Sequence, residues 1–433
     1  MRRLLIFSSL TLVLFQSAVA QQLEKHIETS RANGLKMLKT VKQQIEENYY
    51  DPNFHGLDLD ARFAEAEARI KTATTQGQVI GIIAQAVVDL NDSHTRLVPP
   101  LRGGVVVYGW RMQMIGDKCY ITGVMRGSDA EAKGLRVGDR ILALDGVAPT
   151  RDTMWKIKYY YYSLRPKSSV RVTLQTGNET KRDVEVTTKY FSYHTGYFTY
   201  EYNHDLGPEL GNEETPDVLY EEIGDLIICR LDSFRIDDGA VNTMMKRISR
   251  FKKLIFDLRR NPGGYSRAVD RTISYFFDHE VKVADLKMRN ETKEDRVKPQ
   301  KSNIFSGELI VLIDSESTSA AEIFARVMQL EKRGRVIGDI SGGRVMQSIR
   351  FSSQLDSRDL VVYGMMITRA DLIMSDGKSL EWTGVTPDTR MVPTAEDIRD
   401  GRDPVLAYAV SLAGVTMTPE KAGALFGNAR KTH

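Results

Sequence analysis

Short apolar runs alternate with helical segments through the second half of this sequence. Residues 226–229 and 309–313 are continuous apolar runs, 254–258 is apolar except at Asp257, and all three have the length of buried strands. Segments with helical periodicity, such as 238–251, separate these runs. Such alternation is typical of a layered α/β core, in which helices pack on a sheet. It predicts an α/β core over residues 223–395.

The first half of the chain shows two other sequence patterns. After residue 21, apolar residues such as Leu38, Val41 and Ile45 recur at helical spacing and predict a helical region. From about residue 101, short strands and glycine turns predict a β-rich domain. We therefore expect a multidomain α/β protein with these divisions: a signal peptide (1–20), a helical N-terminal region (21–100), a β-rich domain (101–190), a linker (191–222), the α/β core (223–395) and a C-terminal helical segment (396–433).

The N-terminus predicts the compartment. Arg2 and Arg3 supply positive charge, residues 4–15 are almost wholly apolar, and the Ala18-Val19-Ala20 signature precedes Gln21. This pattern is typical of a secretory signal peptide, and the apolar run is shorter than the roughly 20 residues that span a bilayer. An uncleaved anchor is the alternative. We expect an exported protein, periplasmic or extracellular, with no integral membrane segment after cleavage.

Charge and metal-ligand residues exclude several function classes. Sixty Lys and Arg residues against 57 Asp and Glu leave a net charge of +3, which gives no electrostatic basis for binding nucleic acid. Cys119 and Cys229 lie in predicted strands of different domains, so two buried free thiols are favoured over a disulfide. The seven His residues show no paired ligand spacing, so we expect neither a metal site nor a cofactor.

Two loops that follow predicted strands carry residues suited to acyl-transfer chemistry. The strand 309–313 runs into a cluster of Ser and Thr residues that ends at Ser319, just before a helix from Ala320. A Ser at such a turn could act as a nucleophile near a helix N-terminus, or it could simply cap the helix. The strand 254–258 leads to Gly263-Gly264, where paired glycines permit an oxyanion hole or an ordinary loop.

Two further segments carry titratable groups. His94, within the tetrad 92–95, could take a serine proton near neutral pH, although a lone His near a helix end is often structural. Glu381 could orient an imidazole or its partner, or it could be an ordinary surface residue. Taken singly, each segment leaves both interpretations open.

Taken together, the four segments resemble the C-terminal-processing (tail-specific) serine proteases and their tricorn-core relatives. The resemblance covers nearly the whole mature chain, and its most specific pieces are LIFDLRRNPGG (254–264), the SxSAAEI run (317–323), DSHT (92–95) and EWTGVTPD (381–388). It implies a helical N-terminal region, an inserted PDZ-like domain and a crotonase-like α/β core.

The resemblance offers two catalytic arrangements. In the Ser-Lys branch a lysine stands 25 residues after the nucleophile, but here that position is Arg344, which stays protonated and cannot act as a base. The Gln that assists this lysine would fall at Ser348. The tricorn-like branch instead implies a tetrad. In it Ser319 is the nucleophile and His94 the base, while Ser93 and Glu381 orient His94.

The same resemblance implies the remaining site groups. The oxyanion donors would be backbone amides of Gly263 or Gly264 and of Ala320. Arg344 would then be either a clamp for a substrate carboxylate or a structural residue, and the second is favoured.

Residues 129–141 resemble the helix, glycine turn and strand of a PDZ module. PDZ modules bind an extended peptide C-terminus by adding it to a sheet edge, which residues 102–110 could supply here. The aromatic cluster of Trp155 and 159–162 could line the peptide groove, or it could be ordinary packing.

The function that this resemblance implies is a secreted serine-type endopeptidase that acts through an acyl-enzyme on proteins or peptides. Two alternatives from other classes stay open: a relative of the fold that binds apolar ligands, and a PDZ scaffold with an idle core. The sequence does not indicate the oligomeric state.

Overall fold

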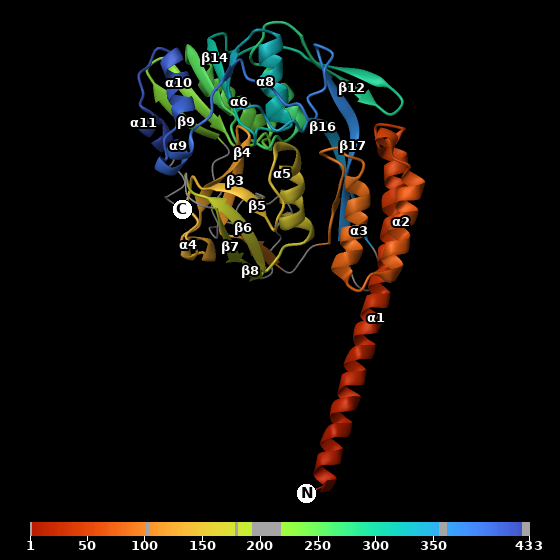
Figure 1. Cartoon of the computed structure of the whole chain (residues 1–433). Coiled ribbons are helices and arrows are strands. Elements are labelled where there is room, and N and C mark those ends of the chain that lie inside the picture. The colour runs from red at the N-terminus through yellow and green to blue at the C-terminus, as the bar shows by residue number, and fades with distance from the viewer. Residues whose placement is uncertain (1, 101–103, 178–180, 193–217, 355–361, 427–433) are drawn as a thin grey trace. The chain divides into compact units, whose positions relative to one another are not determined.

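The computed structural model describes residues 2–100, 104–177, 181–192, 218–354 and 362–426 (Figure 1). The chain divides into two compact units. The first comprises Met1–Leu101, Ser163–Arg165 and Ser348–Arg369, and the second comprises Arg102–Tyr162, Pro166–Gln347 and Ala370–His433. Most of the expected linker, residues 193–217, lies outside the described residues, as does the tail from 427 to 433.

The first unit is built on helices, as the sequence predicts. It contains α1 (Arg2–Asn48), the short 3-10 helix η1 (Phe54–Gly56), α2 (Leu59–Thr72) and α3 (Gln76–Val88). Side-chain caps begin two of these helices, since Asp58 accepts from Ala61 N before α2 and Thr75 accepts from Gln78 N before α3. Both helices pack against α1, and the packed face of α1 includes the predicted residues Leu38, Val41 and Ile45. In the described part of the chain, no helix has the length and apolar character needed to cross a membrane.

One long strand belongs to both units. Strand β17 (Val362–Met374) pairs in the first unit with β1 (Arg96–Val98), which follows directly after the DSHT tetrad. In the second unit its last residues pair with β12 (Val281–Met288), which in turn pairs with β13 (Thr292–Val297). A further strand, β16 (Met346–Gln354), pairs with β17. The residues of these strands carry no alternating or continuous apolar pattern from which they were predicted.

The β-rich domain of the second unit has an antiparallel sheet in the order β3-β4-β5-β6-β7. Its strands are β3 (Trp110–Ile115), β4 (Lys118–Val124), β5 (Arg140–Leu144), β6 (Ser169–Gln175) and β7 (Arg182–Thr187), and a separate pair is formed by β2 (Gly104–Val107) and β8 (Lys189–Ser192). The helices are α4 (Asp129–Ala132) and α5 (Arg151–Lys158), which continues as a π-helical segment, η2 (Tyr159–Leu164). A tight turn follows β5, where Asp145 and Gly146 have φ values of 48° and 85°.

The α/β core has a six-stranded sheet in the order β18-β15-β14-β11-β10-β9. The strands are β9 (Val218–Ile223), β10 (Leu226–Leu231), β11 (Lys253–Asp257), β14 (Glu308–Ile313), β15 (Arg335–Gly338) and β18 (Thr389–Arg390). All neighbours pair in parallel except β9 with β10. The continuous apolar runs in the sequence reflect this arrangement, because a covered parallel sheet buries both faces of each strand.

Helices cover the two faces of this sheet (Figure 1). Alternate strand residues such as Phe256 and Val311 pack against α6 (Asp238–Ile248), α7 (Ser266–Ile273) and α8 (Ala320–Leu330). The intervening residues, such as Ile255 and Ile310, pack against α10 (Pro404–Leu412) and α11 (Pro419–Ala424). The short helix α9 (Ala395–Asp400) precedes α10. The predicted fold class, with its helical N-terminal region, β-rich domain and α/β core, is confirmed.

Candidate active site

Ser319 occupies a strained turn between the central strand β14 and helix α8. Its backbone angles are φ 56° and ψ −118°, a region that residues with a side chain rarely adopt. A sharp strand-to-helix turn of this kind is how many hydrolases present a nucleophilic serine. The neighbouring Ser317 is fully buried and donates to Leu258 O at 2.8 Å. The two serines therefore have different roles, and Ser319 is the one in the strained position.

A buried carboxylate holds this turn in place. Glu322 is fully buried, and its Oε2 accepts from the amides of Ser319 (2.9 Å) and Arg344 (3.0 Å). Its Oε1 accepts from Ser341 Oγ (2.5 Å) and from Gly343 N (2.8 Å). Burial raises the pKa of this carboxyl, and the four donors oppose that shift. Sequence reasoning missed Glu322, although its place three residues after Ser319 is a capping-box signal.

The glycine loop after β11 approaches Ser319 closely. Gly263 has φ +88°, and a Cβ atom on it would lie 2.7 Å from the Cβ of Ser319 and 2.9 Å from Ala320 N. Any larger residue would collide with the turn. The predicted glycine pair and the predicted serine are thus brought together.

The amides of this loop are not equivalent. Gly263 N donates to Asn261 Oδ1 at 2.8 Å, so this donor is already engaged. For the amides of Gly264 and Ala320, the described part of the chain provides no acceptor. Of the expected oxyanion donors, these two are therefore better suited than Gly263 to receive a developing negative charge.

Glu381 is linked to the same group of loops. Its Oε2 accepts from Val345 N at 2.9 Å, and the adjacent Trp382 donates its amide to Gly343 O at 2.7 Å. Residue 344 continues the chain of contacts, because Arg344 O accepts from Ser319 N at 3.0 Å. The backbone of Arg344 therefore has a structural role beside the proposed nucleophile.

Ser93 and His94 form a pair inside the first unit. Ser93 Oγ lies 2.7 Å from His94 Nδ1, within hydrogen-bond distance. The buried Asp92 fixes the pair, since its Oδ1 accepts from His94 N (2.8 Å), Thr95 N (2.6 Å) and the hydroxyl of Thr368 (2.8 Å). Thr368 belongs to β17, so the tetrad 92–95 is anchored to a strand of its own unit.

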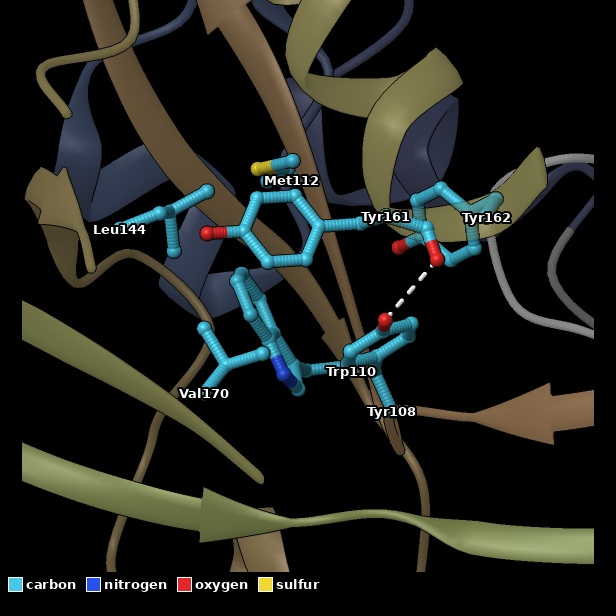
Figure 2. Close-up of a pocket in the computed structure, with 7 residues that line it drawn as sticks. All are labelled: Tyr108, Trp110, Met112, Leu144, Tyr161, Tyr162 and Val170. Atoms are coloured by element: carbon cyan, nitrogen blue, oxygen red, sulfur yellow. Dashed lines mark hydrogen bonds between the residues drawn. The ribbon is translucent and has the colours of Figure 1, made fainter. Parts of the chain in front are cut away.

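The β-rich domain carries an aromatic pocket (Figure 2). It is lined by Tyr108, Trp110, Met112, Leu144, Tyr161, Tyr162 and Val170. Tyr108 donates its hydroxyl to Tyr161 O at 2.9 Å, as the dashed line in Figure 2 marks. The pocket thus includes residues of the predicted sheet edge and of the aromatic cluster 159–162, while Arg102 and Gly103 lie outside the described residues. Tyr161 also serves as packing, since it is buried and donates to Asp145 Oδ2 at 2.7 Å.

Both cysteines are buried free thiols, as predicted. Burial raises the pKa of Cys119 to about 12 and raises that of Cys229 further. Within the described ranges, no group of three or more His, Cys, Asp or Glu side chains could hold a metal ion.

Two family models match this chain. Residues 225–391 match the model of peptidase family S41, and residues 106–188 match the PDZ domain. A CtpA-like serine protease of Staphylococcus haemolyticus (strain JCSC1435) is 24% identical over 296 residues, which are 67% of this chain and 53% of that protein. A CtpA-like serine protease of Staphylococcus aureus (strain bovine RF122 / ET3-1) is 24% identical over 297 residues, 66% of this chain and 52% of that protein. The chain thus spans about half the length of these relatives.

Solved structures share the fold. Mature CPAF matches with a TM-score of 0.65 at 16% identity, over 92% of this chain and 98% of that one. The photosystem II D1 C-terminal processing protease matches with a TM-score of 0.52 at 18% identity, over 83% of this chain and 93% of that one. The region matched to peptidase family S41 contains the strained serine, the glycine loop and Glu381. Residues 225–391 are thus similar to peptidase family S41, and about two thirds of the chain is similar to CtpA-like serine proteases.

Proposed function

We propose that this protein is an exported serine-type endopeptidase that cleaves proteins or peptides through an acyl-enzyme. The observation that carries this proposal is the strained Ser319, with the glycine loop packed against it at Gly263. A backbone strained at a single serine, against a loop that must be glycine, is expected of a functional site. An ordinary N-cap residue needs neither feature.

In the proposed reaction, Ser319 Oγ attacks the carbonyl carbon of the scissile peptide bond. His94 takes the hydroxyl proton as general base and then passes it to the departing amine. The negative oxygen of the tetrahedral intermediate binds the amides of Gly264 and Ala320. In the second half of the reaction the same imidazole takes a proton from a water molecule as its oxygen attacks the ester carbonyl, and it gives that proton to Ser319 Oγ as the new carboxylic acid leaves.

Ser93 and Glu381 orient the base in this scheme. The contact of 2.7 Å between Ser93 Oγ and His94 Nδ1 supports the part assigned to Ser93. A hydroxyl can donate and accept at once, so Ser93 would connect His94 to Glu381. This arrangement leaves the second ring nitrogen of His94 to serve Ser319.

The PDZ-like domain would bind the C-terminus of a substrate. PDZ modules add a peptide strand to a sheet edge and place alternate side chains in pockets. The aromatic lining of the pocket suits an apolar side chain. The basic and apolar pattern of residues 1–20 supports export with removal of this segment, to a periplasmic or extracellular location.

A fluorophosphonate probe, which labels activated serines, tests the proposal. We expect the full-length protein to be labelled and a Ser319→Ala variant not to be. A Ser317→Ala variant is a matched control for the neighbouring hydroxyl, and we expect it to keep its label when folded. Equal labelling of wild type and Ser319→Ala would refute the peptidase and leave the idle-scaffold or ligand-binding alternatives.

A further inference from the structure

One face of helix α5 in the PDZ-like domain contacts three loops of the α/β core. Arg151, Trp155 and Lys158 are spaced at i, i+4 and i+7, which places them on one side of the helix. Each reaches a different loop, and each loop leads to or adjoins a residue of the proposed active site. All of these residues belong to the second unit.

Lys158 contacts the loop that ends at the nucleophile. Its Nζ lies 2.7 Å from Glu316 Oε1, and the two side chains are only 15% and 14% exposed. Glu316 stands three residues before Ser319, and its other oxygen lies 3.5 Å from Arg260 Nε. Arg260 stands three residues before Gly263, so this ion pair touches both elements of the proposed oxyanion site.

Arg151 contacts the loop that carries the partners of Glu322. Its Nη2 lies 2.5 Å from Asp339 Oδ2, and its Nη1 donates to Ile340 O at 3.0 Å. Asp339 is 4% exposed and stands two residues before the segment 341–345. That segment binds Glu322 and, through Val345 N, the carboxylate of Glu381.

Trp155 contacts the loop of the proposed acid. Its ring centroid lies 5.9 Å from that of Trp382, with the planes at 36°. Trp382 follows Glu381 directly and has φ 63°, an unfavourable value for a bulky residue. Its indole is 38% exposed, so the contact with Trp155 covers a side chain that would otherwise stand open.

We propose that this face of α5 is a positioning element for the active site, with Arg151, Trp155 and Lys158 as positioning residues. The inference rests on the proposed peptidase function. If the helix served only to attach the PDZ-like domain to the core, apolar contact at any place on the core would be sufficient. Instead, the helix places a directional contact on each loop that frames Ser319, the oxyanion amides and Glu381. Partly buried ion pairs define geometry more than they add stability.

Paired substitutions test the proposal. Lys158→Glu places a negative charge against Glu316, whereas Lys158→Arg keeps the ion pair. Trp155→Ala removes the ring contact, whereas Trp155→Phe keeps an aromatic ring. Lys181→Glu reverses an exposed lysine of the same domain and is the matched control.

We expect Lys158→Glu and Trp155→Ala to lower kcat for a peptide substrate by about tenfold or more, with KM little changed. Fluorophosphonate labelling should slow to the same extent. The two conservative variants and the control should keep rates close to wild type. Wild-type kcat in Lys158→Glu and Trp155→Ala would overturn the positioning role, as would equal losses in the conservative variants.

Amide hydrogen exchange separates this inference from the proposed function. In Lys158→Glu and Trp155→Ala, exchange should accelerate over 314–322, 339–345 and 380–385, and it should stay at wild-type rates in Lys181→Glu. This readout holds even if Ser319 is never labelled, in which case only the peptidase proposal fails. Unchanged exchange in all three loops would refute the positioning role directly.

Discussion

Replacing Glu322 by Gln should damage both the stability and the reactivity of the Ser319 turn. The substitution keeps the shape of the side chain but turns one carboxylate oxygen into an NH2 group. Each oxygen of Glu322 accepts two hydrogen bonds, but Ser319 N also donates to Arg344 O, and the Ser341 hydroxyl can turn to accept from the new NH2 group. Whichever way the amide is oriented, one backbone amide, that of Arg344 or that of Gly343, therefore loses its acceptor. An unsatisfied buried donor costs about 1–3 kcal/mol, so the loss in the free energy of unfolding should be about 1–3 kcal/mol.

Urea unfolding and the rate of fluorophosphonate labelling measure the two effects. We expect Glu322→Gln to unfold at lower urea concentration and to label more slowly, because Arg344 N or Gly343 N, beside the Ser319 turn, loses its fixed acceptor. Glu331→Gln, at the exposed end of the same helix, is the control and should change stability by less than about 0.5 kcal/mol. If Glu322→Gln matched wild type in both assays, the carboxylate would not be the anchor of this turn.

Three further predictions concern other parts of the molecule. Gly263→Ala puts a Cβ atom 2.7 Å from that of Ser319, so labelling should fall about 100-fold while circular dichroism shows a folded protein; labelling at the wild-type rate would contradict the close approach. Asp270 has a pKa raised to about 7 by burial and then by the Asp295 carboxylate, above the unfolded value of about 3.9, so its stabilising contribution at low pH is lost as pH rises between these values. Asp270→Asn should therefore raise the thermal midpoint relative to wild type at about pH 8 but not at about pH 4, and an equal shift at both would argue against this titration. Ser93→Ala should shift the pH profile of labelling by altering the imidazole of His94, and an unchanged profile would remove Ser93 from the tetrad.

Much of the fold could be predicted from the sequence because its central strands are buried on both faces. The runs 254–258 and 309–313 are apolar at every position except Asp257, and each coincides closely with a strand of the core sheet. Strand β13 escaped prediction because four of its six residues are charged and most of it is exposed. Its pairing with β12 comes from backbone contacts, which leave no periodic signal in the sequence.

Residues of the proposed site could be predicted only where a residue type suited to catalysis stands next to a recognisable strand end or helix start. Ser319 lies between an apolar strand and a helix start, and Gly263-Gly264 follows another strand, so both were found. Glu322 resembles any acidic residue in the first turn of a helix, and only the structure reveals its four donors. The engagement of Gly263 N by Asn261 likewise depends on the path of the loop. The contacts of α5 join residues far apart in the chain, such as Trp155 and Trp382, and no local pattern encodes them.

The central claim is that His94, built into the helical unit, serves Ser319 of the α/β core. A crystal structure of the protein with a phosphonate bound covalently to Ser319 tests it most directly. We expect a ring nitrogen of His94 at about 2.6–3.2 Å from Ser319 Oγ, and the phosphoryl oxygen bound by the amides of Gly264 and Ala320. An adduct in which the imidazole stays beyond hydrogen-bond reach, with no bridging water, would contradict the claim.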